Sequence, residues 1–256
     1  MKLRCCKLPF FCMFLLLALP FATWAGEFVK TASEADYPPF SYLDEAGVAT
    51  GFDVEITKAL CKEMRRDCEI ILMGFDEILP AVVQGKLDMA VAGFGATPER
   101  SKSVDFTDHY YRSHSIFIEK TKGTGEAQPL VLKGKRIGTQ ADTIQENYLR
   151  KIYGNDITLI LKPDFEEIFK ELQAGRVDFV LIDALSGYTY LKTELGNGLE
   201  PLEEPVIAPE LDISAHIAVS KKNSALREDL NKAIQAILRN GEYNRINNKY
   251  FDFNIY

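Results

Sequence analysis

Hydrophobic and polar positions recur along this chain with two periods, and each period predicts a different element. Residues 27–33 (EFVKTAS) alternate, as a half-buried strand does. Ile56, Leu60 and Met64 recur every four positions, which is typical of one face of a helix. Asp53 stands just before that face, where its carboxylate can accept hydrogen bonds from free backbone N–H groups. We therefore expect a strand followed by a helix that Asp53 caps.

The next elements form a unit that the chain contains twice. A buried strand at 69–73, a helix at 76–84 and a strand at 87–92 follow one another. Shifted by 90 positions, this unit aligns without a gap on the segment that ends at Asp183. The aligned pairs include Phe75 with Phe165, Glu77 with Glu167, Ile78 with Ile168, Gly85 with Gly175 and Asp88 with Asp178. Two copies of an α/β unit predict two lobes of similar build, each with helices on a mostly parallel sheet.

The first copy leads into a candidate anion site. Residues 93–107 (GFGATPERSKSVDFT) supply two glycines, Thr97 before a proline, and Arg100. Glycine lets a backbone approach a bound group closely, and Thr97 can cap a short helix whose free N–H groups attract an anion. Arg100 can grip a carboxylate with two N–H groups. The alternative, which this segment alone leaves open, is an ordinary turn with a surface arginine.

The second copy ends in an acid at the matching place. Asp183 aligns with Gly93, so two strands that point their carboxyl ends at one cleft would bring Arg100 and Asp183 to opposite ends of a bound molecule. That arrangement is complementary to the carboxylate and ammonium of an amino acid. The turn at residues 140–145 adds N–H groups and the Thr143 hydroxyl. An ordinary helix cap in each segment is the alternative.

Residues 1–25 are predicted to be a secretory signal peptide. Three basic residues precede an apolar run over 8–21, and small residues before Ala25 suit a signal peptidase. The run is short for a membrane span, although an uncleaved anchor is the alternative. After cleavage near Ala25, 27 Lys and Arg stand against 37 Asp and Glu, a net charge of −10. A chain this acidic is a poor candidate for binding nucleic acid or anionic lipid.

Cys61 and Cys68 are the two cysteines that would remain after cleavage. In an oxidising compartment, two thiols seven positions apart at a junction of a helix and a strand predict a disulfide. Free thiols are the alternative. A metal site is disfavoured, because no histidine accompanies the pair.

Together these segments resemble a known family, the periplasmic solute-binding proteins (family 3) that deliver polar amino acids to ABC importers. The likeness covers essentially the whole mature chain and is closest to the lysine/arginine/ornithine, histidine and arginine binders. The segments that carry it are EADYPPF, GFDVEITKALCKEM, FDEILPAVVQGKLDMAVAG, TPERSKSVDFTDHYY, LKGKRIGTQ, AGRVDFVLID and KYFDFNIY.

The resemblance implies an α/β protein with a Venus-flytrap fold, whose two lobes, joined by two crossings, close on one amino acid. Lobe 1 would comprise residues 26–112 and 210–256, and lobe 2 residues 113–209. The protein would work in the periplasm as a monomer without a cofactor or metal, and an inner-membrane ABC permease would recognise its closed form. The mature chain would not insert into the membrane. A disulfide between Cys61 and Cys68 is also implied.

Position by position, the resemblance implies a set of ligand contacts. Arg100 would bind the α-carboxylate, with N–H groups near Gly95 and Ile144. Asp183 and the Gly93 carbonyl would bind the α-ammonium. The other contacts would be Tyr37 and Phe75, which sandwich the ligand side chain, Glu34 near its far end, and Gln140, Thr143 and Gln145 on the opposing lobe.

Three departures from the family leave the ligand open. Ala92 and Gly95 stand where several relatives have serine or another polar residue, and Ile144 replaces a threonine. Backbone contacts survive these changes, whereas side-chain hydrogen bonds do not. Glu34 with two aromatic faces still favours a cationic side chain, since the carboxylate and the rings both attract it. We expect arginine first, then lysine or ornithine, then histidine, with glutamine as a further option.

Two other functions stay open at this stage. A periplasmic enzyme on the same scaffold, such as a cyclohexadienyl or arogenate dehydratase, would use Glu34 as a general acid. The sensing domain of a receptor would be followed by a membrane span and a signalling module, whereas this chain stops at Tyr256. Since no paired carboxylates stand out and His109, His114 and His216 are scattered, we expect a binding protein without catalysis.

Overall fold

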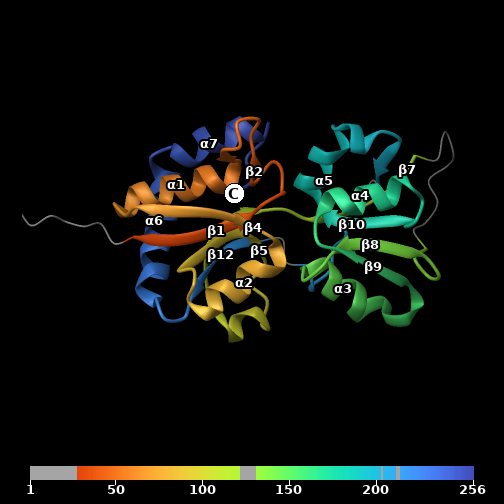
Figure 1. The fold of residues 1–256 in the computed structure, drawn as a ribbon, viewed down its shortest axis with the longest axis horizontal. Helices are drawn as coiled ribbons and strands as arrows, with labels where there is room; N and C mark the ends of the chain where they lie inside the picture. The colour runs from red at the N-terminus through yellow and green to blue at the C-terminus, as the bar shows by residue number, and fades with distance from the viewer. Residues whose placement is uncertain (1–27, 122–130, 203, 212–213) are drawn as a thin grey trace, which may run out of the picture.

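The computed structural model describes residues 28–121, 131–202, 204–211 and 214–256, which form two α/β lobes side by side (Figure 1). Each lobe is built on one five-stranded sheet. The predicted signal peptide lies outside the described residues. None of the helices in the described part of the chain has the length and hydropathy of a bilayer span.

Lobe 1 contains the first sheet and the helices that cover it. Its strands are β1 (Val29–Glu34), β4 (Cys68–Met73), β5 (Met89–Phe94), β6 (Val104–Arg112) and β12 (Ser214–Ser220). Its helices are α1 (Phe52–Met64), α2 (Phe75–Gln84), η1 (Arg100–Lys102), α6 (Ser224–Arg239) and α7 (Glu242–Tyr250), and its small hairpin joins β2 (Tyr42–Leu43) to β3 (Ala49–Thr50).

Lobe 2 contains the second sheet. Its strands are β7 (Ser115–Lys120), β8 (Arg136–Gln140), β9 (Thr158–Lys162), β10 (Phe179–Asp183) and β11 (Leu199–Pro201). Its helices are α3 (Ile144–Tyr153), η2 (Gly154–Asp156), α4 (Phe165–Gln173), α5 (Ala184–Leu191) and η3 (Glu194–Gly196). The chain enters this lobe between β6 and β7 and leaves it between β11 and β12.

The two sheets have the same strand order, which confirms the predicted pair of similar lobes. Lobe 1 reads β4-β1-β5-β12-β6 and lobe 2 reads β9-β8-β10-β7-β11. In each sheet the first three strands are parallel, the fourth is antiparallel to both its neighbours, and the fifth therefore runs with the first three. The predicted mostly parallel sheets are thus correct, with one reversed strand in each.

The repeat extends to individual hydrogen bonds. Gly85 and Gly175 end α2 and the turn after α4 with φ of +77° and +70°, a conformation that favours glycine. Asp88 N donates to Lys30 O at 2.8 Å, and Asp178 N donates to Arg136 O at 2.8 Å. The turn has the same geometry in both copies, and the strand after it, β5 or β10, occupies the same position in its sheet.

The predicted role of Asp53 as a helix cap is wrong. Helix α1 begins at Phe52, its N-cap is Gly51, and no side chain caps it. Gly51 has a φ of +115°, and a Cβ there would lie 2.3 Å from the carbonyl oxygen of Phe40, so this close approach requires glycine. Asp53 instead lies inside the first turn, fully buried, and its carboxylate accepts a hydrogen bond from Tyr110.

The predicted disulfide between Cys61 and Cys68 is present, with the two Cα atoms 6.2 Å apart. It joins the last turns of α1 to the first residue of β4. The aromatic C-terminal segment packs on lobe 1: the ring of Phe52 on α1 lies 5.8 Å from that of Tyr243 and 5.6 Å from that of Phe251.

Candidate ligand-binding site

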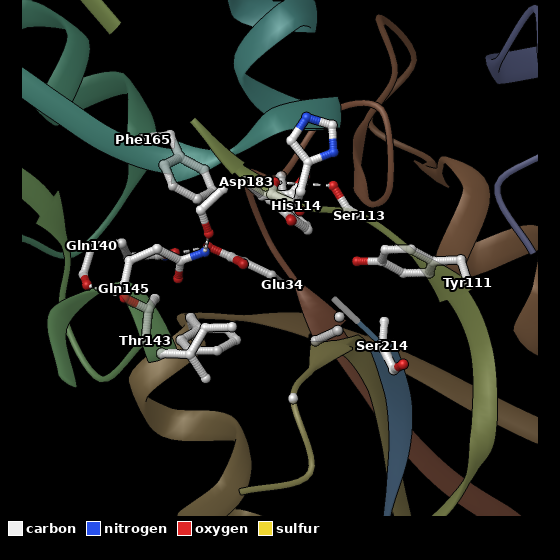
Figure 2. A pocket seen from close by; sticks show the side chains of 18 of the residues that line it. Glu34, Tyr111, Ser113, His114, Gln140, Thr143, Gln145, Phe165, Asp183 and Ser214 are labelled. Atoms are coloured by element: carbon white, nitrogen blue, oxygen red, sulfur yellow. Dashed lines mark hydrogen bonds between the residues drawn. The ribbon is translucent and has the colours of Figure 1, made fainter. Parts of the chain in front are cut away.

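A cavity of about 60 Å³ lies between the lobes, and the structure brings all eleven predicted site residues to it (Figure 2). These residues are Glu34, Tyr37, Phe75, Gly93, Gly95, Arg100, Gln140, Thr143, Ile144, Gln145 and Asp183. Their contact with a ligand stays a prediction. The remaining lining residues are Ala92, Tyr111, Ser113, His114, Ser115, Phe165, Ser214 and Ala215.

Sheet topology explains why residues far apart in the chain meet here. Glu34 is the last residue of β1, Gln140 of β8 and Asp183 of β10. The carboxyl ends of parallel strands lie at one edge of a sheet, and binding sites of α/β proteins form there. Both sheets point that edge at the space between the lobes, so the cavity collects strand ends from each.

Arg100 reaches across the cavity from lobe 1 to lobe 2. Its Nη1 donates to Gly95 O at 3.1 Å, and its Nη2 donates to Asp142 O at 2.7 Å. The guanidinium carbon lies 5.8 Å from the ring centre of Phe75 and 5.3 Å from that of Phe94. Burial lowers the pKa of Arg100 to about 10, which leaves the group charged at neutral pH. The structure therefore places the cation of Arg100 in the cavity wall.

The turn that carries Arg100 differs from the predicted one. The hydroxyl of Thr97 accepts from Arg100 N at 3.2 Å, but the helix is a single 3₁₀ turn whose N-cap is Glu99 rather than Thr97. The N–H group of Ser101 donates to Thr97 O at 3.0 Å, and that of Thr97 donates to Gly95 O at 3.0 Å. Because these N–H groups are bonded within the turn, they are not available to an anion. The guanidinium is the positive group that this segment offers.

Asp142, the partner of Arg100 in lobe 2, has a φ of +60°, which few residues other than glycine adopt. Glu146 holds it, because Asp142 N donates to Glu146 Oε2 at 2.7 Å. The next residue, Thr143, is the N-cap of α3 and accepts from Glu146 N at 3.2 Å. Thr143 thus lines the cavity and caps a helix, so the two interpretations of that residue are compatible.

Two carboxyl groups face the cavity, of which Glu34 is buried and Asp183 is partly buried. Burial raises the pKa of Glu34 to about 8, against a smaller lowering by the hydrogen bond that Gln140 Nε2 donates to it from lobe 2. Burial raises the pKa of Asp183 to about 6, and hydrogen bonds from Ser113, Ser186 and Leu185 oppose that rise. Asp183 accepts from Ser186 N at 3.2 Å and so also caps α5. A cation between these groups would favour their ionised forms.

Three aromatic rings surround the space beside Glu34. Tyr37 stacks on Phe40 with ring centres 4.9 Å apart, and Phe75 stacks on Phe94 at 5.0 Å. Phe165, at the start of α4, lies 5.3 Å from the ring of Tyr37. The predicted aromatic pair therefore has a third member. The internal repeat aligned Phe165 with Phe75, and that alignment was the signal by which Phe165 could have been found.

Five further unpredicted residues come from the crossings between the lobes, whereas Ala92 lies on β5 and Tyr111 on β6. Ser113, His114 and Ser115 follow β6, and Ser214 and Ala215 begin β12. Figure 2 shows His114 and Ser113 beside Asp183. Burial lowers the pKa of His114.

The two other histidines, His109 and His216, do not line the cavity. His109 stacks on Tyr256 with ring centres 4.7 Å apart, and His216 Nδ1 lies 2.8 Å from Thr107 O. His114 differs, because it lines the cavity. No pattern in the sequence around His114 marks it, because it reaches the cavity through the path of the crossing.

Comparison with known proteins agrees with this geometry. The family model for "Bacterial extracellular solute-binding proteins, family 3" matches residues 29–253. The chain is 34% identical over 239 residues to "ABC transporter arginine-binding protein 1" of Escherichia coli, covering 93% of this chain and 96% of the relative. It is 33% identical over 250 residues to the "L-arginine-binding protein" of Pseudomonas aeruginosa, covering 94% of each.

A solved structure described as "An ancestral arginine-binding protein bound to arginine" superposes with a TM-score of 0.80, at 34% identity, over 88% of this chain and 98% of the other. These relatives are binding proteins, which confirms the prediction of a binding protein rather than an enzyme. The family match places the protein on the extracytoplasmic side of the inner membrane. The chain therefore belongs to the bacterial extracellular solute-binding proteins of family 3.

Proposed function

We propose that this protein is the substrate-binding component of an amino-acid ABC importer and that it binds L-arginine between its lobes. The observation that supports this ligand is the set of ionisable groups around one cavity: a cation at Arg100 and carboxyl groups at Glu34 and Asp183. Arginine carries the opposite set, one carboxylate and two cations. The arginine-binding relatives support the same ligand.

In this proposal each end of the ligand contacts a group of opposite charge. Arg100 binds the α-carboxylate and Asp183 the α-ammonium, while Glu34 attracts the guanidinium between the rings of Tyr37, Phe75 and Phe165. Gly93, Gly95, Gln140, Thr143, Ile144 and Gln145 complete the lining. Because Arg100 and Asp183 belong to different lobes, one ligand stabilises the form in which the lobes are together.

The remaining parts of the proposal concern the cellular setting. The signal peptide is removed near Ala25, lobe 1 comprises 26–112 with 210–256, and lobe 2 comprises 113–209. The protein acts as a monomer, and an inner-membrane ABC permease recognises the closed lobes. A dehydratase activity is not proposed, since the relatives named above are binding proteins.

Isothermal titration calorimetry on the protein without residues 1–25 tests this proposal. We expect L-arginine to bind with a micromolar or lower Kd, and lysine, ornithine, histidine and glutamine to bind more weakly. Citrulline, which has the shape of arginine but no side-chain charge, should bind at least about tenfold more weakly, the effect of one lost charge-assisted contact. Equal affinity for citrulline and arginine would contradict the role of Glu34. No heat with any amino acid would overturn the proposed function.

A further inference from the structure

Strand β5 is irregular where it reaches the cavity. Against β12, His216 pairs with Phe94 but Ala218 pairs with Ala90, so two steps on β12 span four on β5. Gly93 lies within this bulge with a φ of +63°. A Cβ on Gly93 would lie 2.5 Å from the hydroxyl of Tyr111, so a larger residue does not fit. The bulge therefore depends on glycine and sets the direction of the backbone at the cavity wall.

The N–H group of Gly93 is bonded by a side chain rather than by the neighbouring strand. Gly93 N donates to the hydroxyl oxygen of Tyr110 at 3.0 Å, and that hydroxyl donates to Asp53 Oδ1 at 2.9 Å. Tyr110 is on β6 and Asp53 is on α1, so the chain of two hydrogen bonds links three elements of lobe 1. A hydroxyl that donates to a carboxylate is also a better acceptor, which strengthens its bond to Gly93.

Asp53 is an unusual residue to bury in this place. Its exposed fraction is 0% and that of Tyr110 is 1%. In the part of the chain that the structure describes, Asp53 Oδ2 has no hydrogen-bond partner. Burying a carboxyl group without a cation or a full set of donors destabilises a fold. Asp53 does not cap helix α1. Its hydrogen bond from Tyr110 is therefore the contact that gives a reason for its burial.

We propose that Asp53 and Tyr110 are positioning residues for the α-ammonium of the ligand. By holding the N–H group of Gly93 on the side away from the ligand, they turn the Gly93 carbonyl toward the ammonium that Asp183 also binds. Neither residue lines the cavity, so they act through Gly93. This inference rests on the proposed function, because it assumes an amino-acid ligand.

The test combines one hydroxyl deletion with two ligands. Tyr110→Phe removes the hydroxyl that holds Gly93, and 5-guanidinopentanoate is arginine without its α-amine. We expect Tyr110→Phe to weaken L-arginine about tenfold, the effect of one misplaced hydrogen bond, and to weaken the analogue less than about twofold. Equal losses for both ligands, or no loss for either, would overturn the inference, because only a positioning role depends on the amine.

Tyr243→Phe is the matched control. The Tyr243 hydroxyl is also buried and donates to Tyr110 O at 2.8 Å, but it does not contact Gly93. This variant should leave the ratio of the two affinities unchanged. If Tyr110→Phe does not fold, Asp53→Asn keeps the shape of the carboxyl group and weakens the acceptor for Tyr110. It should then reduce arginine affinity more than analogue affinity.

Hydrogen exchange gives a measurement that needs no ligand. The Gly93 amide should exchange at least about tenfold faster in Tyr110→Phe than in the wild type, because its bond to the hydroxyl is lost. Equal exchange rates would contradict the hydrogen bond on which the inference depends. If the wild type bound arginine but the variants kept the same ratio of affinities for arginine and 5-guanidinopentanoate, this inference alone would fail. If the wild type bound no amino acid, the proposed function would fail and this inference with it.

Discussion

Among single residues, Arg100 carries the largest share of the proposed recognition. Its guanidinium already contacts a carbonyl in each lobe, at Gly95 and Asp142, and it still has N–H groups for a ligand carboxylate. An arginine can serve several acceptors in one plane because its donors are fixed in a fork. A lysine at this position has one charged nitrogen, which cannot reach the two carbonyls and a carboxylate with that geometry.

We therefore expect Arg100→Lys to weaken L-arginine binding by about 100-fold, because paired charge-assisted hydrogen bonds are lost. Calorimetry measures the change. Lys102→Met is the control, since Lys102 is an exposed cation two residues away whose partner is Glu99. It should leave the affinity unchanged. Full affinity in Arg100→Lys would show that the ligand carboxylate binds elsewhere.

Several site residues could be predicted from the sequence because each stands at a strand end or a turn with a local signal. The sequence predicts the wrong role for Asp53, because an acid at the start of a helix suits a cap, and the local pattern does not show the hydroxyl of Tyr110 beside it. The repeat aligns Phe165 with Phe75, but no local signal beside Phe165 shows its contact with Tyr37. His114 could not be found, because the path of a crossing depends on how the lobes pack.

Among the elements, local periodicity predicted strands and helices well but not which strands are neighbours. The repeated strand, helix and strand are present in both lobes with matching turn geometry. Periodicity does not predict the positions of the reversed strands β12 and β7, because these positions depend on the crossings between the lobes. The disulfide was predictable from compartment and spacing, and it fixes the end of α1 to the edge strand β4.

Removing that disulfide should lower stability without affecting recognition. Replacing both Cys61 and Cys68 by serine should reduce the free energy of unfolding by about 2 to 3 kcal/mol, the value for closure of a short loop. Chemical denaturation measures this loss. Neither cysteine lines the cavity, so the affinity for arginine should change less than about twofold. A large loss of affinity would mean that the α1–β4 junction is coupled to the cleft.

At the scale of the whole molecule, three carboxyl groups lie in or near the cavity wall, where burial opposes their charge. Burial raises the pKa of Glu34 to about 8, of Asp53 to about 7 and of Asp183 to about 6. Each folded-state pKa lies above the ordinary value of about 4. The folded protein therefore binds more protons than the unfolded chain from about pH 4 up to those values, and these groups stabilise the fold less as the pH rises.

Two opposite trends with pH should follow. Without ligand, the free energy of unfolding should fall between pH 5 and 8, as denaturant titrations can show. Arginine affinity should rise over the same range, by up to about tenfold per pH unit for each carboxyl group that loses its proton on binding. In Glu34→Gln the rise should be shallower above pH 7, because the group with the highest pKa is gone. A wild-type affinity that falls with pH would contradict this electrostatic account.

The position of β12 has a consequence for how the polypeptide acquires its shape as it is made. This strand, residues 214–220, stands between β5 and β6, and β6 joins its sheet through β12 alone. The strands of lobe 2 are contiguous between 115 and 201, so that lobe can assemble while the ribosome is still translating. The sheet of lobe 1 lacks β12, the strand between β5 and β6, until nearly the end of translation. Lobe 1, which carries Arg100, therefore completes its sheet after lobe 2.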